Sequence, residues 1–276
     1  MEVYSEKCDI LRTQVREYAK EPVLIAFSGG VDSSLLLKLA CEAAGETGQK
    51  VYAVTVHSRL HPAEDLDIAA RVAGEAGAVH RVLFTDELKE AGIAQNPKDR
   101  CYRCKKCLFQ KIQHLAGELG VKMILEGTNA DDLKVYRPGI RAVRELGILS
   151  PLADCGMTKE EIRQYAGKLK ISVAGRPAGP CLATRFPYGT QLTYEQMERV
   201  DKGERYLRTL GFDTVRLRVH ADLVRIEVEE SALCRVFQHR IEITEYLKSL
   251  GYTYVTIDIE GFRSGSMDIE SREDRS

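Results

Sequence analysis

The first half of the chain alternates short apolar runs with helical patterns, and this alternation constrains the fold more than any other feature of the sequence. Runs typical of buried strands occur at 23–27, 51–56, 80–84 and 122–126. Helical apolar spacing lies between them at 35–44, 63–76 and 106–119. Strands separated by helices of this length are joined by right-handed crossovers, so the sequence predicts an α/β fold with a doubly wound parallel sheet.

The second half has a different pattern, which begins after the glycine- and proline-rich segment 175–180. Before that segment, a capping box formed by Thr158 and Glu161 predicts a helix that runs to about Leu169. After it, helices are predicted at 194–210 and 231–250, and strands at 214–219, 223–228 and 252–259. We therefore expect an α/β domain over 1–175, a linker loop over 176–190 and a smaller α+β domain with an antiparallel strand pair over 191–276, ending in a frayed polar tail from Ser264.

Composition indicates a globular enzyme. The chain is 44% hydrophobic with a mean hydropathy of −0.25, and it has neither a signal-peptide pattern nor a membrane-length apolar run of about 18 residues. We expect a cytoplasmic protein with no membrane association. With 40 basic and 41 acidic residues the net charge is −1, so no overall field favours nucleic acid. The eight cysteines are expected to be reduced thiols, metal ligands or catalysts.

The strongest motif is SGGVDSS at 28–34, between a predicted strand and a predicted helix. Two glycines let the backbone approach an anion, and the helix N-terminus offers free N–H groups. Asp32 beside a phosphate requires a Mg²⁺ ion between them, and we predict that Asp32 is catalytic as well as ATP-binding. The alternative is a Gly-Gly turn with a capping side chain. The motif's phosphate donors are predicted to be Ser28, Gly29, Gly30, Ser33 and Ser34.

A second motif is formed by closely spaced cysteines. Cys101, Cys104 and Cys107 have C-x₂-C-x₂-C spacing, and Cys181 follows in the glycine- and proline-rich loop. This set suits a Cys₄ zinc site or an iron–sulfur cluster. A zinc ribbon would present a second C-x₂-C pair, which is absent, so we favour three cluster ligands that leave one iron open; spare buried thiols are the alternative. The remaining cysteines are interpreted as packing residues: Cys8, Cys41, Cys155 and Cys234.

A third motif places arginines on one predicted strand. Arg216 and Arg218 are alternate residues, so they share a strand face and could grip a phosphate or carboxylate. A solvated face paired with Glu227 and Glu229 is the alternative. We predict an anion site built from the strand, from nearby loops and from one orienting or cation-binding carboxylate: Arg185, Glu204, Arg216, Arg218 and Arg263.

SGGVDSS resembles the PP-loop of the ATP-pyrophosphatase superfamily, whose members cleave ATP between its α and β phosphates. The resemblance extends to EGTNADD at 126–132, and it implies that Gly127 and Asn129 help to bind ATP. This segment follows the fourth predicted strand, so Asn129, Asp131 and Asp132 are expected at the edge of the sheet where ligands bind. Turn residues that cap a strand are the alternative.

Together the motifs resemble the LarE family of ATP-dependent sulfur transferases in nickel-pincer nucleotide biosynthesis. The resemblance covers nearly the whole chain, through SGGVDSS, NPKDRCYRCK, EGTNADD, YRPG, CLATRFPYG, TVRLRVH and GFRSG. It implies that the substrate is a small nucleotide, pyridinium-3,5-biscarboxylic acid mononucleotide. Each carboxylate is adenylated and converted to a thiocarboxylate, with ATP and Mg²⁺ required.

The family uses two sulfur chemistries. Some members sacrifice one cysteine, which becomes dehydroalanine; others hold a [4Fe–4S] cluster on three cysteines and carry an extra sulfide from a donor. The resemblance implies the second type here, with ligands Cys101, Cys104 and Cys181, the last also catalytic. Cys107 departs from the three-cysteine pattern, and the sequence leaves open whether it is a fourth ligand and whether sulfur comes from the cluster or from Cys181. A homo-oligomer is also implied.

Three other functions are compatible with a PP-loop but fit this sequence less well. A PP-loop tRNA thiolase needs a basic surface, but residues 191–276 carry 13 basic and 17 acidic groups. The excess of basic residues at 98–111 is better matched to a small anionic nucleotide. An amide-forming PP-loop enzyme would leave the cysteines without a role, and a nucleotide sensor would release no pyrophosphate. The sequence thus favours a sulfur transferase that does not bind nucleic acid.

Overall fold

The computed structural model describes residues 2–62, 64–135, 137–176, 179, 181–263 and 265–267. The chain divides into two compact units. Unit 1 comprises 1–58, 63–92 and 99–179, and unit 2 comprises 59–62, 93–98 and 180–276. Apart from 265–267, the tail that was expected to fray lies outside the described residues. None of the helices in the ranges above is both long and apolar enough to span a membrane.

Unit 1 is built on a parallel sheet, which confirms the predicted fold class. Its strands are β1 (Val23–Ala26), β2 (Val51–His57), β3 (Val79–Phe84) and β4 (Met123–Leu125). They lie in the order β3-β2-β1-β4, and every neighbouring pair is parallel. The crossover helices between successive strands are α2 (Val31–Thr47), α3 (Glu64–Ala76) and α5 (Arg100–Glu118).

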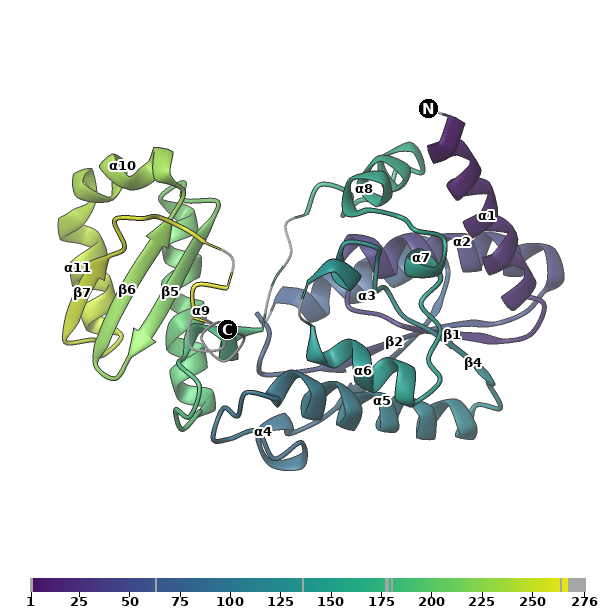
Figure 1. Ribbon diagram of the computed structural model, residues 1–276, viewed down its shortest axis with the longest axis horizontal. Coiled ribbons are helices and arrows are strands. Elements are labelled where there is room, and N and C mark those ends of the chain that lie inside the picture. The colour runs from purple at the N-terminus through teal and green to yellow at the C-terminus, as the bar shows by residue number, and fades with distance from the viewer. Residues whose placement is uncertain are drawn as a thin grey trace. The chain divides into compact units, whose positions relative to one another are not determined.

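Helices cover both faces of this sheet (Figure 1). Helices α1 (Glu2–Tyr18), α2, α3 and α8 (Lys159–Lys168) lie on one face, while α5 and α6 (Pro138–Glu145) lie on the other. Along β1, Ile25 belongs to the core beneath α1 and α2, and Leu24 belongs to the core with Phe109 of α5. A strand buried on both faces must be apolar throughout, which explains the uninterrupted apolar runs in the sequence.

The strand order reverses between β1 and β4. The chain proceeds outward from β1 through β2 to β3 and then returns to place β4 on the other side of β1. At such a switch point, loops leave the carboxyl ends of adjacent strands in opposite directions and open a crevice for a ligand. The segments that follow β1 and β4 are 28–34 and 126–132, the two motifs of the predicted ATP site.

Two helical features of unit 1 differ from the sequence prediction. Helix α5 begins at Arg100 and not at 106, so Cys101 and Cys104 lie within the helix. Its first turns are polar, and apolar spacing therefore could not reveal them. Helix α1 was not predicted, although Leu11 and Val15 recur on one buried face. The predicted capping box at Thr158 is confirmed, with both of its hydrogen bonds present.

Unit 2 is a smaller α+β fold with a mixed sheet. Strand β5 (Val215–His220) pairs antiparallel with β6 (Leu223–Val228), as predicted, and β6 pairs parallel with β7 (Tyr254–Ile257). Helix α9 (Tyr194–Thr209) packs closely on β5: a methyl group added at Gly203 would lie 2.4 Å from Leu217 Cδ1. The single helix predicted over 231–250 is instead divided into α10 (Leu233–Gln238) and α11 (Arg240–Ser249) at His239, whose ring packs on Phe212.

Candidate functional site

The segment 28–34 forms the turn from β1 into α2. Gly29 has a positive φ of 70°, and a side chain there would lie 3.1 Å from the backbone of Ala69, so glycine is required on both counts. Gly30 is the N-cap of α2 and makes no side-chain cap hydrogen bond. The first N–H groups of α2, beside its positive dipole end, are therefore suited to an anion.

The predicted hydroxyl donors differ in their surroundings. Ser33 Oγ donates to the carbonyl of Gly30 at 3.2 Å and accepts from the Ser28 N–H at 3.3 Å. Ser34 is 1% exposed, and its hydroxyl has no hydrogen-bond partner among the described residues. Ser28 is exposed. Of the three, Ser28 is thus the most accessible to a ligand, and Ser33 also stabilises the turn.

The second motif approaches this turn closely. A methyl group added at Gly127 would lie 3.0 Å from the Ser33 backbone nitrogen and 3.1 Å from Asp32 Cβ. Asn129 Nδ2 donates to Asp32 Oδ1 at 3.3 Å. Asn129 Oδ1 also accepts from the N–H groups of Asp131 and Asp132 at 3.0 and 3.1 Å, which fixes the loop. The predicted residues Asp32, Gly127 and Asn129 therefore form one site.

Lys159 belongs to this site, although the sequence analysis did not identify it. Its ammonium donates to Asp32 Oδ2, and its backbone N–H donates to Asp131 Oδ2 at 2.9 Å. The capping box at Thr158 fixes the start of α8 and so holds Lys159 in place. A hydrogen bond from Lys134, followed by the N–H of Lys159, lowers the pKa of Asp131. The capping box in the sequence could have pointed to Lys159, because it identifies Thr158 as the N-cap and so Lys159 as the first residue of α8.

A divalent cation is compatible with the same carboxylate. Asp32 is half-buried at a helix N-terminus, and a cationic group, the Lys159 ammonium, already contacts it. Mg²⁺ in phosphate sites typically uses one or two protein carboxylates, with phosphate and water oxygens completing its shell. Asp32 can therefore hold Mg²⁺ together with bound phosphates.

The candidate cluster ligands are divided between the two units. Cys101 and Cys104 lie one turn apart in α5 of unit 1, and Cys181 belongs to unit 2. Within the described ranges, no group of three or more His, Cys, Asp or Glu side chains has the arrangement of a metal site. The prediction of a cluster therefore rests on the cysteine spacing and on the sequence resemblance alone.

Cys107 is half-buried, whereas Cys101 is exposed. Burial raises the pKa of its thiol; Lys111 opposes this effect, and the charges of Glu90 and Glu87 add to the rise. Lys111 itself forms an ion pair with Glu90 of α4 (Glu87–Glu90). The environment of Cys107 therefore favours the protonated form of its free thiol.

The Cys181 loop is held by the arginines that were predicted to bind an anion. The carbonyl of Cys181 accepts from the N–H and hydroxyl of Thr184 at 3.0 and 2.7 Å and from Arg185 Nη1 at 3.3 Å. Arg218 Nη1 donates to the Thr184 carbonyl at 3.1 Å. Asn96, part of the NPKD segment, is fully buried and donates to the carbonyls of the FPYG segment. Unit 2 therefore fixes the backbone around Cys181.

Arg185 and Glu204 form a buried ion pair. Each side chain is 2% exposed, and Arg185 donates through Nε and Nη2 to the two oxygens of Glu204 at 2.8 and 2.9 Å. Burial alone would raise the pKa of Glu204, but Arg185, Arg216 and the Leu217 N–H lower it. Glu204 orients Arg185, as expected. Glu204 and the oxygens of Cys181 and Thr184 engage the Arg185 guanidinium, so Arg185 supports the site and is not itself an anion ligand.

Arg216 and Arg218 share a face of β5, as predicted, but their partners differ. Arg218 donates through Nε to the fully buried Glu227 at 2.8 Å. Arg216 contacts the Val215 carbonyl and the ring of Phe262, and makes no ion pair with a carboxylate among the described residues. Burial, followed by the charge of Arg185, lowers the pKa of Arg216 to about 10. This half-buried guanidinium, which makes no ion pair in the described chain, is the best-placed anion donor of the group.

Arg263 belongs to an adjoining network on the same sheet. It pairs with Asp258 at 3.2 Å, and Arg225 connects Asp258 to Glu227, the partner of Arg218. A carboxylate therefore separates Arg263 from the strand arginines in this network. Its contribution to an anion site is indirect.

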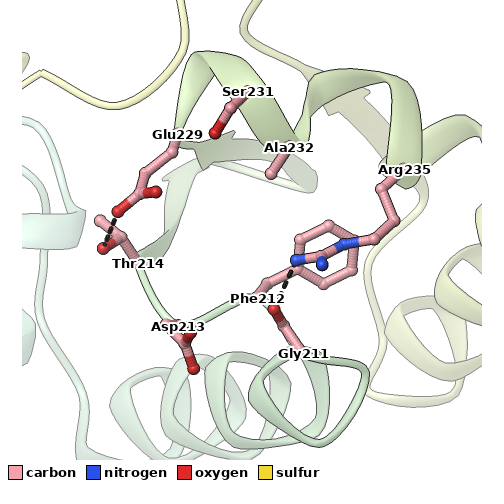
Figure 2. A pocket seen from close by; sticks show the side chains of 8 residues that line it. All are labelled: Gly211, Phe212, Asp213, Thr214, Glu229, Ser231, Ala232 and Arg235. Carbon is pink, nitrogen blue, oxygen red and sulfur yellow. Dashed lines mark hydrogen bonds between the residues drawn. The ribbon is translucent and has the colours of Figure 1, made fainter.

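Unit 2 also has a separate pocket of about 260 Å³ at the start of β5 (Figure 2). Figure 2 shows Arg235 lying over the Phe212 ring and bonded to the Gly211 carbonyl, and Thr214 bonded to Glu229. Arg235 and Thr214 therefore make hydrogen bonds within the pocket lining itself. The lining includes none of the predicted site residues.

The comparisons with known proteins agree with this geometry. Residues 5–136 match the model of the PP-loop domain family. The chain is 37% identical to the pyridinium-3,5-bisthiocarboxylic acid mononucleotide synthase of Lactiplantibacillus plantarum, over 89% of this chain and 88% of that protein. It is 40% identical to an uncharacterised protein of Synechocystis sp., over 89% and 91% of the two chains. An uncharacterised protein of Methanocaldococcus jannaschii is 29% identical, over 95% and 99%. The chain therefore belongs to the LarE family and is an ATP-dependent enzyme of the PP-loop class.

Proposed function

We propose that this protein adenylates the two carboxylates of pyridinium-3,5-biscarboxylic acid mononucleotide and converts them to thiocarboxylates. The observation that carries the proposal is the hydrogen bond from Asn129 to Asp32 at 3.3 Å, which joins the two PP-loop motifs at the sheet switch point. It occurs in a chain 37% identical to the named synthase over nearly the full length of both.

The first step is adenylation. The N–H groups at the start of α2 and the Ser28 hydroxyl bind ATP phosphates, and Asp32 holds the accompanying Mg²⁺. A substrate carboxylate oxygen attacks the α-phosphorus, the bond to the β-phosphate oxygen breaks, and pyrophosphate leaves. If Asp32 held Mg²⁺, the Lys159 ammonium that now contacts Asp32 would be available to contact the phosphates. Positive charge placed where phosphate charge develops lowers the barrier.

The second step is sulfur transfer. A sulfide-level nucleophile attacks the acyl carbon of the adenylate, the bond to the AMP oxygen breaks, and AMP leaves as the thiocarboxylate forms. Arg216 binds the ribose phosphate of the substrate, since it is the half-buried arginine without a carboxylate partner in the described chain. Arg185 and Arg218 position the backbone of Cys181 and Thr184.

A [4Fe–4S] cluster would be the sulfur source, and Cys101, Cys104 and Cys181 would be the residues that hold it. When bound to these three thiolates, such a cluster would supply a site for an extra sulfide from an external donor. The alternative source is Cys181 itself, which would then be consumed.

Mass spectrometry tests this function. Anaerobically purified protein is incubated with Mg-ATP, sulfide and the biscarboxylate mononucleotide, and the small molecules and the intact protein are both weighed. We expect a thiocarboxylate product and an unchanged protein mass. Loss of the mass of hydrogen sulfide from Cys181 would contradict cluster delivery, and absence of the thiocarboxylate would contradict the function.

A further inference from the structure

An ion pair joins the cysteine-bearing helix to the nucleotide loop within unit 1. Lys105 of α5 lies 3.4 Å through Nζ from Oε2 of Glu126, the residue directly before Gly127. The Glu126 side chain is 6% exposed. A carboxylate buried to this degree needs a nearby positive charge and hydrogen-bond donors, because it has lost most of its water.

The other oxygen of Glu126 holds the nucleotide loop. Glu126 Oε1 accepts from the Thr128 N–H at 3.0 Å and from the Ser150 hydroxyl at 2.5 Å. Thr128 lies directly before Asn129, which contacts Asp32. The position of the Glu126 carboxylate therefore affects the backbone that leads to the ATP-binding amide.

Lys105 also belongs to the helix face that carries Cys101. The two residues are four apart, so they are neighbours on α5. A methyl group added at Gly139 of α6 would lie 2.9 Å from Lys105 Cδ and 3.4 Å from the Cys101 carbonyl. Gly139, in the otherwise unexplained YRPG segment, thus leaves the space through which the Lys105 side chain passes.

We propose that Lys105 is a positioning residue that couples occupancy of the nucleotide loop to the position of the Cys101 turn. ATP binding moves the 127–129 backbone, Glu126 moves with it, and Lys105 transmits the change to α5. This coupling rests on the proposed function, in which sulfur transfer must follow adenylation at the same substrate carboxylate. The pair thereby coordinates the two steps.

The first test measures the yield of thiocarboxylate per AMP released. It compares Lys105→Gln and Lys105→Arg with a matched control, Lys106→Gln. Lys106 is the next residue on α5 and makes an ion pair of the same 3.4 Å length with Glu145. We expect Lys105→Gln to lower the yield of thiocarboxylate per AMP about tenfold, because a small displacement of a reacting group is costly, while KM for ATP stays unchanged. Lys105→Arg should restore the yield. An unchanged yield in Lys105→Gln, or an equal loss in Lys106→Gln, would overturn the proposal.

Cysteine labelling provides a second test that needs no sulfur chemistry. The rate of iodoacetamide labelling at Cys101 of the full-length, cluster-free chain is measured by peptide mass spectrometry with and without Mg-ATP. We expect ATP to change this rate at least about fivefold in wild type and Lys106→Gln, but not in Lys105→Gln or Gly139→Ala. Equal ATP effects in all four proteins would refute the coupling, whereas a wild type that makes no thiocarboxylate would refute only the proposed function.

Discussion

The Lys159 ammonium contacts the Asp32 carboxylate at the N-terminus of α2, although 127 positions separate the two residues. The contact connects the start of α8 to the phosphate-binding turn. We predict that Lys159→Gln lowers kcat for substrate-dependent pyrophosphate release about 100-fold, since it removes a positive charge from the reacting phosphates.

The control for this variant is Lys134→Gln. Lys134 pairs with Asp131 of the same loop at 2.9 Å but is 68% exposed. Its loss should leave kcat within about twofold, because exposed ion pairs contribute little. Equal kcat values for the two variants in a coupled pyrophosphate assay would remove Lys159 from the site.

Gly127 is predicted to be essential for ATP binding because the two motifs meet there without space for a side chain. Gly127→Ala places a methyl group 3.0 Å from the Ser33 nitrogen, which forces the loops apart. We expect the Kd for ATP, measured by calorimetry, to rise at least about tenfold. Gly117→Ala in α5 is the matched control: nothing lies within 4 Å of its added methyl group, so it should stabilise the fold by about 0.5–1 kcal/mol. Unchanged ATP affinity in Gly127→Ala would contradict the close approach.

Arg216 is predicted to bind the substrate phosphate. Arg216→Lys retains the charge but loses the two-pronged geometry, so KM for the mononucleotide should rise about tenfold while KM for ATP is unchanged. Arg240→Lys, on the exposed surface of α11, should match wild type. Wild-type kinetics in Arg216→Lys would return this residue to a structural role.

Glu204 is predicted to stabilise unit 2 in a pH-dependent manner. Removing one partner of a buried ion pair costs about 3–5 kcal/mol, so Glu204→Gln should lower the free energy of unfolding by about that amount at pH 7. The folded-state pKa of Glu204 is lowered, chiefly through Arg185. The pair therefore stabilises the fold fully above the ordinary glutamate pKa of about 4.3, and this stabilisation is lost as pH falls through the lower folded-state value.

Urea denaturation of both proteins from pH 7 down to pH 3 measures this effect. The difference in unfolding free energy between wild type and Glu204→Gln should shrink below about pH 4. A difference that stays constant over the whole range would show that Glu204 does not act through its charge.

Cys107 is predicted to remain a protonated thiol at neutral pH. Its pKa is raised above the ordinary value of 9.0, mainly by burial, so iodoacetamide should label it slowly at pH 7 and faster as pH rises beyond 9. Lys111→Gln should raise the pKa further because it removes the opposing charge. Fast labelling of Cys107 at pH 7 would contradict this environment.

The sequence predicted the parallel sheet and its site because uninterrupted apolar runs and the motifs after them follow from local chemistry. Asp32, Gly127 and Asn129 come together because parallel strands direct their carboxyl ends to one edge. The capping box located Lys159 at the start of α8 but could not show its partner, because Asp32 is 127 positions away in the sequence.

The sequence also could not predict which charged side chains form buried ion pairs. Arg185 was predicted as an anion ligand, yet it is 2% exposed and fully paired with Glu204. Pattern analysis places an arginine in a loop but cannot show which carboxylate the folded chain brings to it. The start of α5 was missed for a related reason: Arg100 and the polar residues after it give no apolar period.

The identity of the ATP products shows whether the protein adenylates its substrate. ATP labelled at the α- and γ-phosphates is incubated with the protein, Mg²⁺ and the biscarboxylate mononucleotide, and the labelled products are separated. We expect AMP and pyrophosphate, formed only when the mononucleotide is present. ADP and inorganic phosphate as the substrate-dependent products would contradict adenylation of the substrate.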